Sequence, residues 1–399
     1  MQRVAVRRNI MEKITDSVFY VGVDSDNELF EGQFCTPEGI SLNSYVIIDD
    51  KIAVMDSVGD GQDEKWLENI KNALGERKPD YLVIHHMEMD HSENIDMFME
   101  EFPEAKIVSS KMAFNMMKNL FGSDFADRQI VASEGFSLDL GSHKLTFIGA
   151  ANVHWPEVLM SYEESEHILF AADGFGKFGQ NEDCKTFADW VSEARRYYFG
   201  IVGKFGANVQ SVLKKAANLQ IDTICSLHGK VLTGDDAKKA ISLYDTWSSY
   251  RAEDENAVVI AYSSVYGHTA EAMEKLADLI KARGVKSVYL FDLAYTDLHL
   301  AVAMAFASGR LVLASTTYNG GIFPTMRTFV EELASRNFQS RKVAFIENGS
   351  WNPSAIKTFK SYFEAMKDIT ICEAKSTIKI AMTENNIKEL EAIAEEITK

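Results

Sequence analysis

The stretch Tyr81–Asn94, YLVIHHMEMDHSEN, decides the fold and the chemistry of the first part of this chain. It opens with the apolar run Tyr81–Ile84, which predicts a buried β-strand. Four side chains that can bind a metal follow within six residues, namely His86, Glu88, Asp90 and His91. While the chain stays extended, a spacing of two sends the first three to one side. Because carboxylates and imidazoles crowded beside an apolar strand repel one another without a cation, the stretch predicts a metal site.

Three further candidate ligands stand just past other apolar runs: His154, Asp173 and His228. Loops at one edge of a sheet can bring such residues together, because the sheet is a rigid scaffold. Taken singly, Asp173 and His228 are better interpreted as capping or turn residues. The remaining histidines of the first half are interpreted as structural: His85, His143 and His167.

The ligand types indicate which metal is bound. The six candidates supply three imidazoles and three carboxylates, a harder and more anionic set than the His-rich or Cys-rich sites that zinc prefers. Three negative charges balance most of the charge on two divalent ions, and carboxylates readily bridge two ions. We therefore expect a dinuclear non-haem iron site.

Length and pattern divide the chain into two domains. A chain of 399 residues exceeds one ordinary core. Residues 1–250 carry many short β-type runs with helical stretches between them. After the polar segment Arg251–Asn256 (RAEDEN), interpreted as a linker, residues 256–399 alternate strictly between strand and helix. That alternation predicts a doubly wound parallel sheet, with strands near Ala257–Tyr262, Ser287–Asp292, Arg310–Ser315, Lys342–Ile346 and Ile369–Ala374.

Composition excludes several classes of function. The net charge of −18 repels phosphate backbones, so nucleic acid is not an expected partner. No apolar run reaches the roughly 18–20 residues needed to cross a bilayer, so no membrane span is expected. The first residues, MQRVAVRRNIMEKI, lack the apolar stretch of a secretory signal, which predicts a cytoplasmic protein.

Three loops of the second half predict a flavin site at the C-terminal ends of the strands. The first, SSVYGHT, presents free backbone N–H groups to a phosphate at a helix N-terminus. In the other two, glycines allow close approach to a flat ring, and Tyr318 and Trp351 can cover its faces. The expected FMN contacts are Ser263, Ser264, Val265, Tyr266, Gly267, His268, Thr269, Ser315, Thr316, Thr317, Tyr318, Asn319, Gly320, Gly321, Asn348, Gly349, Ser350 and Trp351.

The pattern HxExDH, with a later His, Asp and His, resembles the metallo-β-lactamase-like domain of flavodiiron proteins (A-type flavoproteins). Zinc-binding members of that superfamily have His at the second motif position, where this chain has Glu88, as in the flavodiiron branch. The resemblance covers about residues 10–395. It implies an α/β fold in which an N-terminal αββα sandwich precedes a flavodoxin-like FMN domain.

The resemblance also implies roles for the metal-site residues. It assigns His86, Glu88 and His154 to one iron, Asp90 and His228 to the other, and Asp173 to a bridge between them. His91 is placed outside the ligand set, as an orienter of the site or a proton donor.

The function implied is reduction of dioxygen to water, of nitric oxide to nitrous oxide, or of both, with electrons passed through FMN. A head-to-tail homodimer or a homotetramer is implied, which would bring the flavin of one subunit to the irons of another. No CxxC pair occurs, so no fused rubredoxin domain is expected. We therefore expect a separate electron donor, such as a rubredoxin or a reduced deazaflavin coenzyme.

Two other functions stay open on the sequence. One is a zinc metallo-hydrolase fused to a flavodoxin electron carrier. The other is an FMN electron carrier whose first domain is a scaffold without metal. The metal content of the protein distinguishes all three.

Overall fold

The computed structural model describes residues 13–399, so the expectation about a secretory signal in the first residues lies largely outside the described range. Two compact units make up the chain. The first runs to Tyr197 and includes Asn208–Ser242, and the second combines Tyr198–Ala207 with Leu243–Lys399. Each is described by itself below, and the division into domains 1–250 and 256–399 stays a prediction.

The first sheet of the first unit forms around a hairpin with its turn at Asp49-Asp50-Lys51. Apolar strands on either side of this turn pair antiparallel, with Ile48 opposite Ile52. The strands that follow pair parallel, because helices connect them. The order is β1 (Val18–Tyr20), β6 (Tyr45–Ile48), β7 (Ile52–Met55), β8 (Tyr81–Val83), β9 (Lys106–Ser110) and β10 (Gln129–Ala132). The connecting helices are α1 (Asp63–Leu74), α2 (Met89–Ser92), α3 (Ile95–Glu101) and α4 (Lys111–Phe121).

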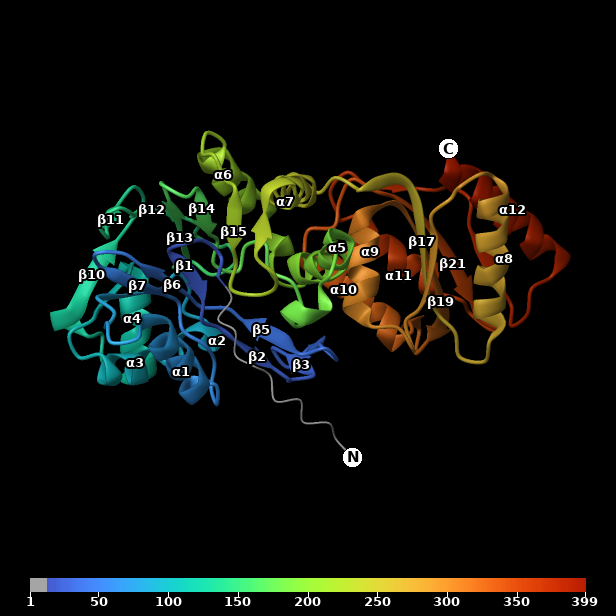
Figure 1. Cartoon of the computed structure of the whole chain (residues 1–399). Helices are drawn as coiled ribbons and strands as arrows, with labels where there is room; N and C mark the ends of the chain where they lie inside the picture. The colour runs from blue at the N-terminus through green and yellow to red at the C-terminus, as the bar shows by residue number, and fades with distance from the viewer. Residues whose placement is uncertain (1–12) are drawn as a thin grey trace, which may run out of the picture. The chain divides into compact units, whose positions relative to one another are not determined.

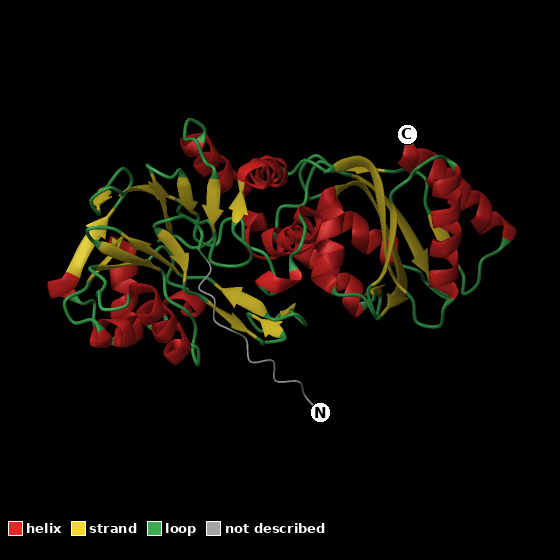
Figure 2. Ribbon diagram, viewed as in Figure 1, coloured by secondary structure: helices red, strands yellow, loops and turns green. Residues whose placement is uncertain are grey.

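The second sheet packs face to face with the first. Its order is β11 (Ser137–Asp139), β12 (Lys144–Gly149), β13 (Leu159–Glu163), β14 (Ile168–Phe170), β15 (Thr223–Cys225) and β16 (Leu232–Thr233). Apolar side chains of both sheets share one core, in which Met55 and Val83 meet Phe147 and Phe170. Helices lie on the outer faces, as Figures 1 and 2 show for α4 and α6 (Gly206–Ala216). The expected αββα sandwich is therefore confirmed.

Smaller elements complete this unit. Two short two-stranded sheets lie between β1 and β6 in the chain, β2 (Val23–Ser25) with β5 (Ile40–Leu42) and β3 (Leu29–Phe30) with β4 (Phe34–Cys35). Helix α5 (Phe187–Tyr197) ends at the boundary of the unit, and the π-helix Tyr198–Val202 and 3₁₀-helix Gly203–Phe205 that follow it belong to the second unit. Helix α7 (Gly234–Ser248) follows β16 and passes from the first unit into the second after Ser242. Further 3₁₀ turns are Ala126–Arg128 and Asn181–Asp183.

The second unit is a parallel sheet covered by helices on both faces. The order is β18 (Val288–Asp292), β17 (Asp254–Ser263), β19 (Ser308–Tyr318), β21 (Lys342–Asn348) and β22 (Thr370–Ile371). Two short strands add to it, β20 (Gly321–Ile322) on β19 and β23 (Ser376–Ile378) on β21. In Figure 1, α8 (His268–Ala282) and α12 (Glu384–Thr398) cover one face, and α9 (Leu298–Ala307), α10 (Pro324–Ser335) and α11 (Ala355–Phe363) cover the other. The doubly wound sheet is confirmed.

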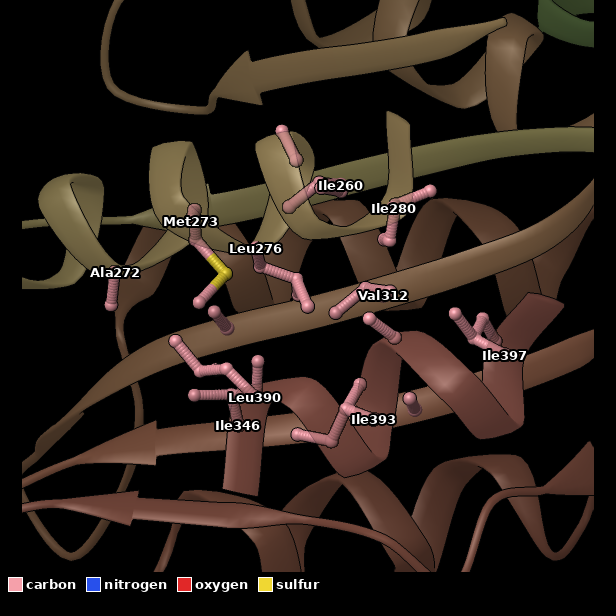
Figure 3. Close-up of a cluster of buried hydrophobic side chains, with 14 of the residues drawn as sticks. Ile260, Ala272, Met273, Leu276, Ile280, Val312, Ile346, Leu390, Ile393 and Ile397 are labelled. Atoms are coloured by element: carbon pink, nitrogen blue, oxygen red, sulfur yellow. The ribbon is translucent and has the colours of Figure 1, made fainter. Parts of the chain in front are cut away.

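The core of this unit follows the helical period expected from the sequence. Met273, Leu276, Ala277 and Ile280 of α8 are buried against the sheet and α12 (Figure 3). Two strand boundaries expected from the sequence were wrong. Strand β17 begins at Asp254, inside the expected linker, because its polar start pairs with β19. In place of the strand expected near Ile369–Ala374 there are two short strands, β22 and β23, because the chain leaves β21 after Ile371 and pairs with it again from Ser376.

No helix among the described residues is long and apolar enough to cross a membrane.

Candidate functional site

The metal-binding stretch begins where β8 ends. The chain bends at His85, and Glu88, the N-cap of α2, has the extended dihedral angles φ −64° and ψ 145°. Asp90 and His91 then lie in a turn of helix, so the sequence expectation of one extended run was wrong beyond Glu88. The helical turn matters, because it carries Asp90 and His91 to a different group of ligands from His86 and Glu88.

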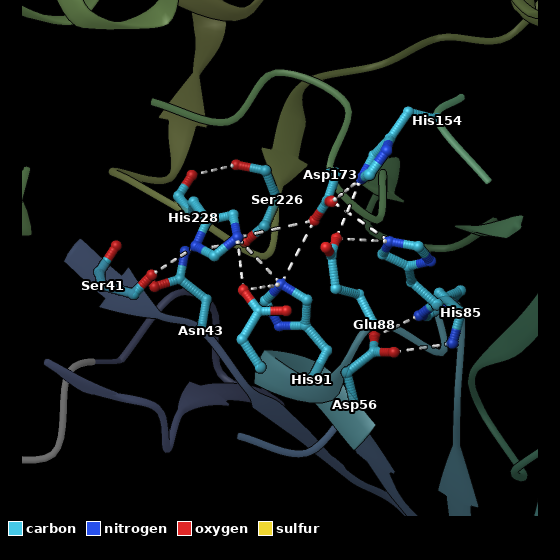
Figure 4. Close-up of polar contacts among 12 residues, drawn as sticks. Ser41, Asn43, Asp56, His85, Glu88, His91, His154, Asp173, Ser226 and His228 are labelled. Atoms are coloured by element: carbon cyan, nitrogen blue, oxygen red, sulfur yellow. Dashed lines mark hydrogen bonds and ion pairs between the residues drawn. The ribbon is translucent and has the colours of Figure 1, made fainter. Parts of the chain in front are cut away.

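The first group consists of His86, Glu88, His154 and Asp173. The Nε2 atom of His154 lies 3.1 Å from an oxygen of Glu88 and 3.1 Å from Oδ2 of Asp173. The Nε2 atom of His86 lies 3.3 Å and 3.4 Å from the same two oxygens. Figure 4 shows three of them, Glu88, His154 and Asp173, converging from separate loops. Four ligand atoms around one point are what a tetrahedral or larger metal site requires.

The second group consists of Asp90, His91 and His228. The Nε2 atoms of His91 and His228 lie 3.0 Å apart, and each lies 3.2 Å from Oδ2 of Asp90. His91 and His228 are fully buried. Two imidazole nitrogens that face each other at this distance need a proton or a cation between them, because their lone pairs repel.

Asp173 stands between the groups, at the end of β14. Its Oδ2 atom faces His86 and His154, and its Oδ1 atom lies 3.3 Å from Nε2 of His91 and 3.8 Å from Nε2 of His228. Strands β14 and β15 are parallel, so Asp173 and His228 leave the sheet at the same edge. One carboxylate with an oxygen toward each group is the arrangement of a bridging ligand.

Hydrogen bonds on the far side of two imidazoles set which nitrogen faces the centre. The Nδ1–H of His86 donates to Glu157 at 2.8 Å, and the Nδ1–H of His228 donates to the carbonyl of Ser41 at 2.8 Å. The Nε2 atom of each ring is therefore left with a lone pair for a metal. Both rings are oriented as ligands rather than as donors of a hydrogen bond to the centre.

The charges of the site call for cations. Burial would lower the pKa of His86, but Asp173 and Glu157 raise it well above its ordinary value. Burial would raise the pKa of Asp173, but His86 and the other imidazoles hold it well below its ordinary value. Both oxygens of Asp90 and Oδ1 of Asp173 are buried and accept no hydrogen bond from the described residues. These unsatisfied acceptors and the mixed donor set fit two divalent ions such as iron.

Every metal ligand expected from the sequence lies in one of the two groups or between them. His91 does so as well, with its Nε2 among the ligand atoms and its Nδ1 without a hydrogen-bond partner among the described residues. The proton-donor role expected for His91 stays a prediction, and the geometry adds a ligand role. His85 lies outside both groups, bound to Asp56 and Ser161.

Sequence reasoning missed two residues near the metal groups. Glu157 also accepts the backbone N–H of Met87 at 2.9 Å, and its place in HWPE, three residues after His154, could have revealed it. Tyr197, on α5, packs its ring 5.5 Å from that of His228. Its buried hydroxyl has no hydrogen-bond partner among the described residues. No signal in the sequence distinguishes Tyr197 from a core aromatic.

In the second unit the three expected loops line one cavity of about 550 Å³. Fourteen of the eighteen expected contacts line it: Ser264, Val265, Tyr266, His268, Thr269, Thr316, Thr317, Tyr318, Asn319, Gly320, Asn348, Gly349, Ser350 and Trp351. Four do not, namely Ser263, Gly267, Ser315 and Gly321. The hydroxyls of Ser263 and Ser315 instead bond within the protein. Asn352 and Ile380 also line the cavity and were not expected from the sequence.

The cavity has the features that a flavin mononucleotide needs. The N-terminus of α8 opens onto it, which supplies backbone donors for a phosphate. The three loops meet at Thr269, whose hydroxyl lies 3.4 Å from that of Thr316 and accepts a hydrogen bond from the side-chain amide of Asn348 at 3.3 Å. Tyr266 and Trp351 are 90% and 83% exposed, so their rings are available to a planar ligand. The residues present therefore fit a phosphate and a flat aromatic ring.

Comparisons with known proteins agree with both sites. A model described as ODP family beta lactamase matches residues 40–229. A nitric oxide reductase of Moorella thermoacetica is 29% identical over 378 residues, and the alignment covers 92% of each chain.

Among solved structures, the flavodiiron protein of Giardia intestinalis matches with a TM-score of 0.90 and 25% identity, over 98% of this chain and 97% of that one. The rubredoxin oxygen:oxidoreductase of Desulfovibrio gigas matches with a TM-score of 0.89 and 23% identity, over 97% of this chain and 98% of that one, and shows the shared fold. The Moorella relative is named as a reductase, which favours an oxidoreductase over the zinc hydrolase. With its two ligand groups and its flavin cavity, the chain is similar over nearly its whole length to flavodiiron proteins.

Proposed function

We propose that this protein reduces dioxygen to water, nitric oxide to nitrous oxide, or both, at two non-haem iron ions. Electrons reach the irons through FMN from an external donor such as a rubredoxin. One observation supports this most directly: the two oxygens of Asp173 face two separate groups of imidazole and carboxylate ligands. Relatives that are named nitric oxide reductase and rubredoxin oxygen:oxidoreductase support the choice of gases.

Each iron has its own set of ligands in this proposal. His86, Glu88 and His154 would hold one ion, Asp90 and His228 would hold the other, and Asp173 would be shared by both. The 3.0 Å approach of His91 to His228 supports His91 as a further ligand of the second ion, in preference to a role as proton donor alone. When bound, ferrous ions supply the electrons that the gas accepts.

Tyr197 is the side chain best placed to hold a proton beside the site. Burial and the negative charge of Asp173 raise the pKa of its phenol well above the ordinary value, so the hydroxyl stays protonated. Because that hydroxyl has no partner among the described residues, its proton is available for a hydrogen bond to a small molecule.

The FMN would lie in the cavity of the second unit, with its phosphate at the loop before α8 and its ring between the other loops. The exposed apolar side chains at this cavity, Tyr266, Trp351 and Ile380, support a subunit contact there. We include a head-to-tail homodimer, or a tetramer built from such dimers, in the proposal. Cytoplasmic location, expected from the sequence, is part of it as well.

Metal analysis and anaerobic stopped-flow kinetics test this function. Two irons per chain, and oxidation of the photoreduced protein by one of the two gases, are expected. His86→Asn should abolish gas consumption while the flavin stays bound. Two zinc ions per chain, or full gas consumption by the variant, would reject the proposal. A monomer in an active preparation would reject the dimer.

A further inference from the structure

The sequence contains two Asn-Gly pairs, and both line the flavin cavity. One is Asn319-Gly320, directly after β19, and the other is Asn348-Gly349, at the end of β21. An Asn-Gly pair is chemically labile, because glycine has no side chain to keep its backbone nitrogen away from the asparagine amide. When that nitrogen attacks the amide carbon, a C–N bond forms, ammonia leaves, and the chain carries a five-membered imide. The surroundings of each pair decide whether this attack can occur.

Asn319-Gly320 is open to the reaction. The pair forms the two-residue turn between β19 and β20, with φ angles of 48° and 74°, and both residues are exposed. Neither the side-chain amide of Asn319 nor the backbone N–H of Gly320 has a hydrogen-bond partner among the described residues. A Cβ atom on Gly320 would meet no other atom within 4 Å. Because β20 has only two residues, little pairing holds the turn closed against the rearrangement that the attack requires.

Asn348-Gly349 is closed to the same reaction. Asn348 is buried, and its side-chain amide both donates to the carbonyl of Ile380 at 2.9 Å and accepts the backbone N–H of Ile380 at 3.0 Å. The backbone N–H of Gly349, which would be the attacking group, donates to the carbonyl of Ile378 at 2.9 Å. These hydrogen bonds must break before the imide can form, which should slow the reaction by about tenfold or more. The second pair is therefore an internal control in the same cavity.

The product of the reaction would bring a negative charge into a cavity that has no carboxylate. Water opens the imide at either of its carbonyls, so the amide and one water become a carboxylic acid and ammonia, with no electron transferred. The described residues that line the cavity include no Asp or Glu. A carboxylate at position 319 would therefore repel the anionic phosphate of FMN. Arg327 is the cation beside the turn, 3.4 Å from the position of a Cβ atom on Gly321, but it does not line the cavity.

We propose that Asn319-Gly320 is a site of spontaneous deamidation that bound flavin protects. This inference rests on the proposed function for the identity of the ligand in the cavity. Asn319 and Gly320 both line the cavity, so bound FMN covers the pair, and a chain that has lost its flavin is open to modification. Because the acid product binds FMN more weakly, the modification makes the loss of the cofactor permanent.

Incubation of the full-length protein with and without FMN in warm, mildly alkaline buffer tests the site. Peptide mass spectrometry measures the fraction of acid at each of the two Asn-Gly pairs over time. In the flavin-free protein, we expect acid to form at Asn319 at least about tenfold faster than at Asn348, because only Asn348 must first break hydrogen bonds. At a free FMN concentration about ten times its dissociation constant, the rate at Asn319 should fall about tenfold, because only the flavin-free chain reacts.

Two variants separate the amide from the charge. Asn319→Gly suits the turn, because glycine accepts a positive φ, and its peptide should gain no acid because it has no amide. Asn319→Asp carries the charge of the product from the start. At low salt it should bind FMN at least about threefold more weakly than Asn319→Gly, and this difference should narrow at high salt, where charges are screened.

Three results would each overturn the proposal. These are equal rates of acid formation at Asn319 and Asn348, a rate at Asn319 that FMN does not change, and equal affinity of Asn319→Asp and Asn319→Gly for FMN. Fresh protein that binds FMN and gives any of these results keeps the proposed function. Fresh protein that binds no FMN rejects the flavin part of the proposed function and the protection with it, so the two failures are distinguishable.

Discussion

Replacement of Glu157 by Gln isolates the contribution of a residue that holds a metal ligand without being one. The carboxylate accepts the Nδ1–H of His86 at 2.8 Å and the backbone N–H of Met87 at 2.9 Å. Gln has nearly the same size and keeps a carbonyl acceptor, so the fold should be retained. In the wild type, the negative charge of Glu157 beside Nδ1 of His86 makes Nε2 a stronger donor to the metal. The substitution removes this charge.

The structure allows the loss to be worked out. A hydrogen bond to a charged group contributes about 1.5–3 kcal/mol and a neutral one about 0.5–1.5 kcal/mol. The exchange therefore costs about 1–1.5 kcal/mol for the bond to His86. Because about 1.4 kcal/mol corresponds to a factor of ten, the iron held by His86 should bind about tenfold more weakly. That value is the lower end of the tenfold to hundredfold range typical of partners behind metal-binding histidines.

Anaerobic titration of the metal-free protein with ferrous ion against a chromophoric chelator measures both dissociation constants. We expect a larger dissociation constant for the ion bound by His86 and little change in the dissociation constant of the ion bound by His228. Glu163→Gln is the matched control, because Glu163 is fully buried and accepts hydrogen bonds from Ser165 and Glu166 outside both ligand groups. Wild-type affinity in Glu157→Gln, or equal weakening in the control, would refute the reasoning.

Four further predictions concern single positions. Asp173→Asn should lower the affinity for both irons while flavin is retained, because one oxygen faces each group, and metal analysis with flavin absorbance checks this. Iodoacetamide should attach one label per native chain, at the exposed Cys35, and mass spectrometry measures this number. Burial raises the pKa of Cys225, so its thiol stays protonated and unreactive between about pH 7 and 9. Trp351→Ala should weaken flavin binding by about 2- to 13-fold, from about 0.5–1.5 kcal/mol of ring contact, with an unchanged Tm because the side chain is 83% exposed. Tyr197→Phe should leave Tm unchanged, because no hydrogen bond is lost among the described residues, and should slow gas turnover by about a hundredfold if the phenol transfers a proton; unchanged turnover would exclude that role.

The local sequence pattern predicted a strand or helix correctly where the apolar residues that define the element lie within a few positions of one another. The apolar run of β8 and the alternation of strand and helix in the second half were read from the sequence, because burial selects apolar residues at the periods of strand and helix. The helical turn that follows Glu88 was not predicted from the sequence, because the same few residues suit both an extended chain and a short helix. The start of β17 was missed because its polar residues are held by pairing with β19, which the local pattern does not contain.

By itself, the sequence determined the inventory of the site: which imidazoles, carboxylates and phosphate-binding loops the chain carries, each just past an apolar strand. Only the tertiary structure decided which of these side chains belong to each of the two ligand groups. His91 and His228 are 137 residues apart in the chain and 3.0 Å apart in space. The two oxygens of Asp173 reach different groups because β14 and β15 leave their sheet at one edge, facing the end of β8 in the other. Such distances depend on the register and stacking of two sheets, which is a property of the whole sandwich rather than of any one stretch.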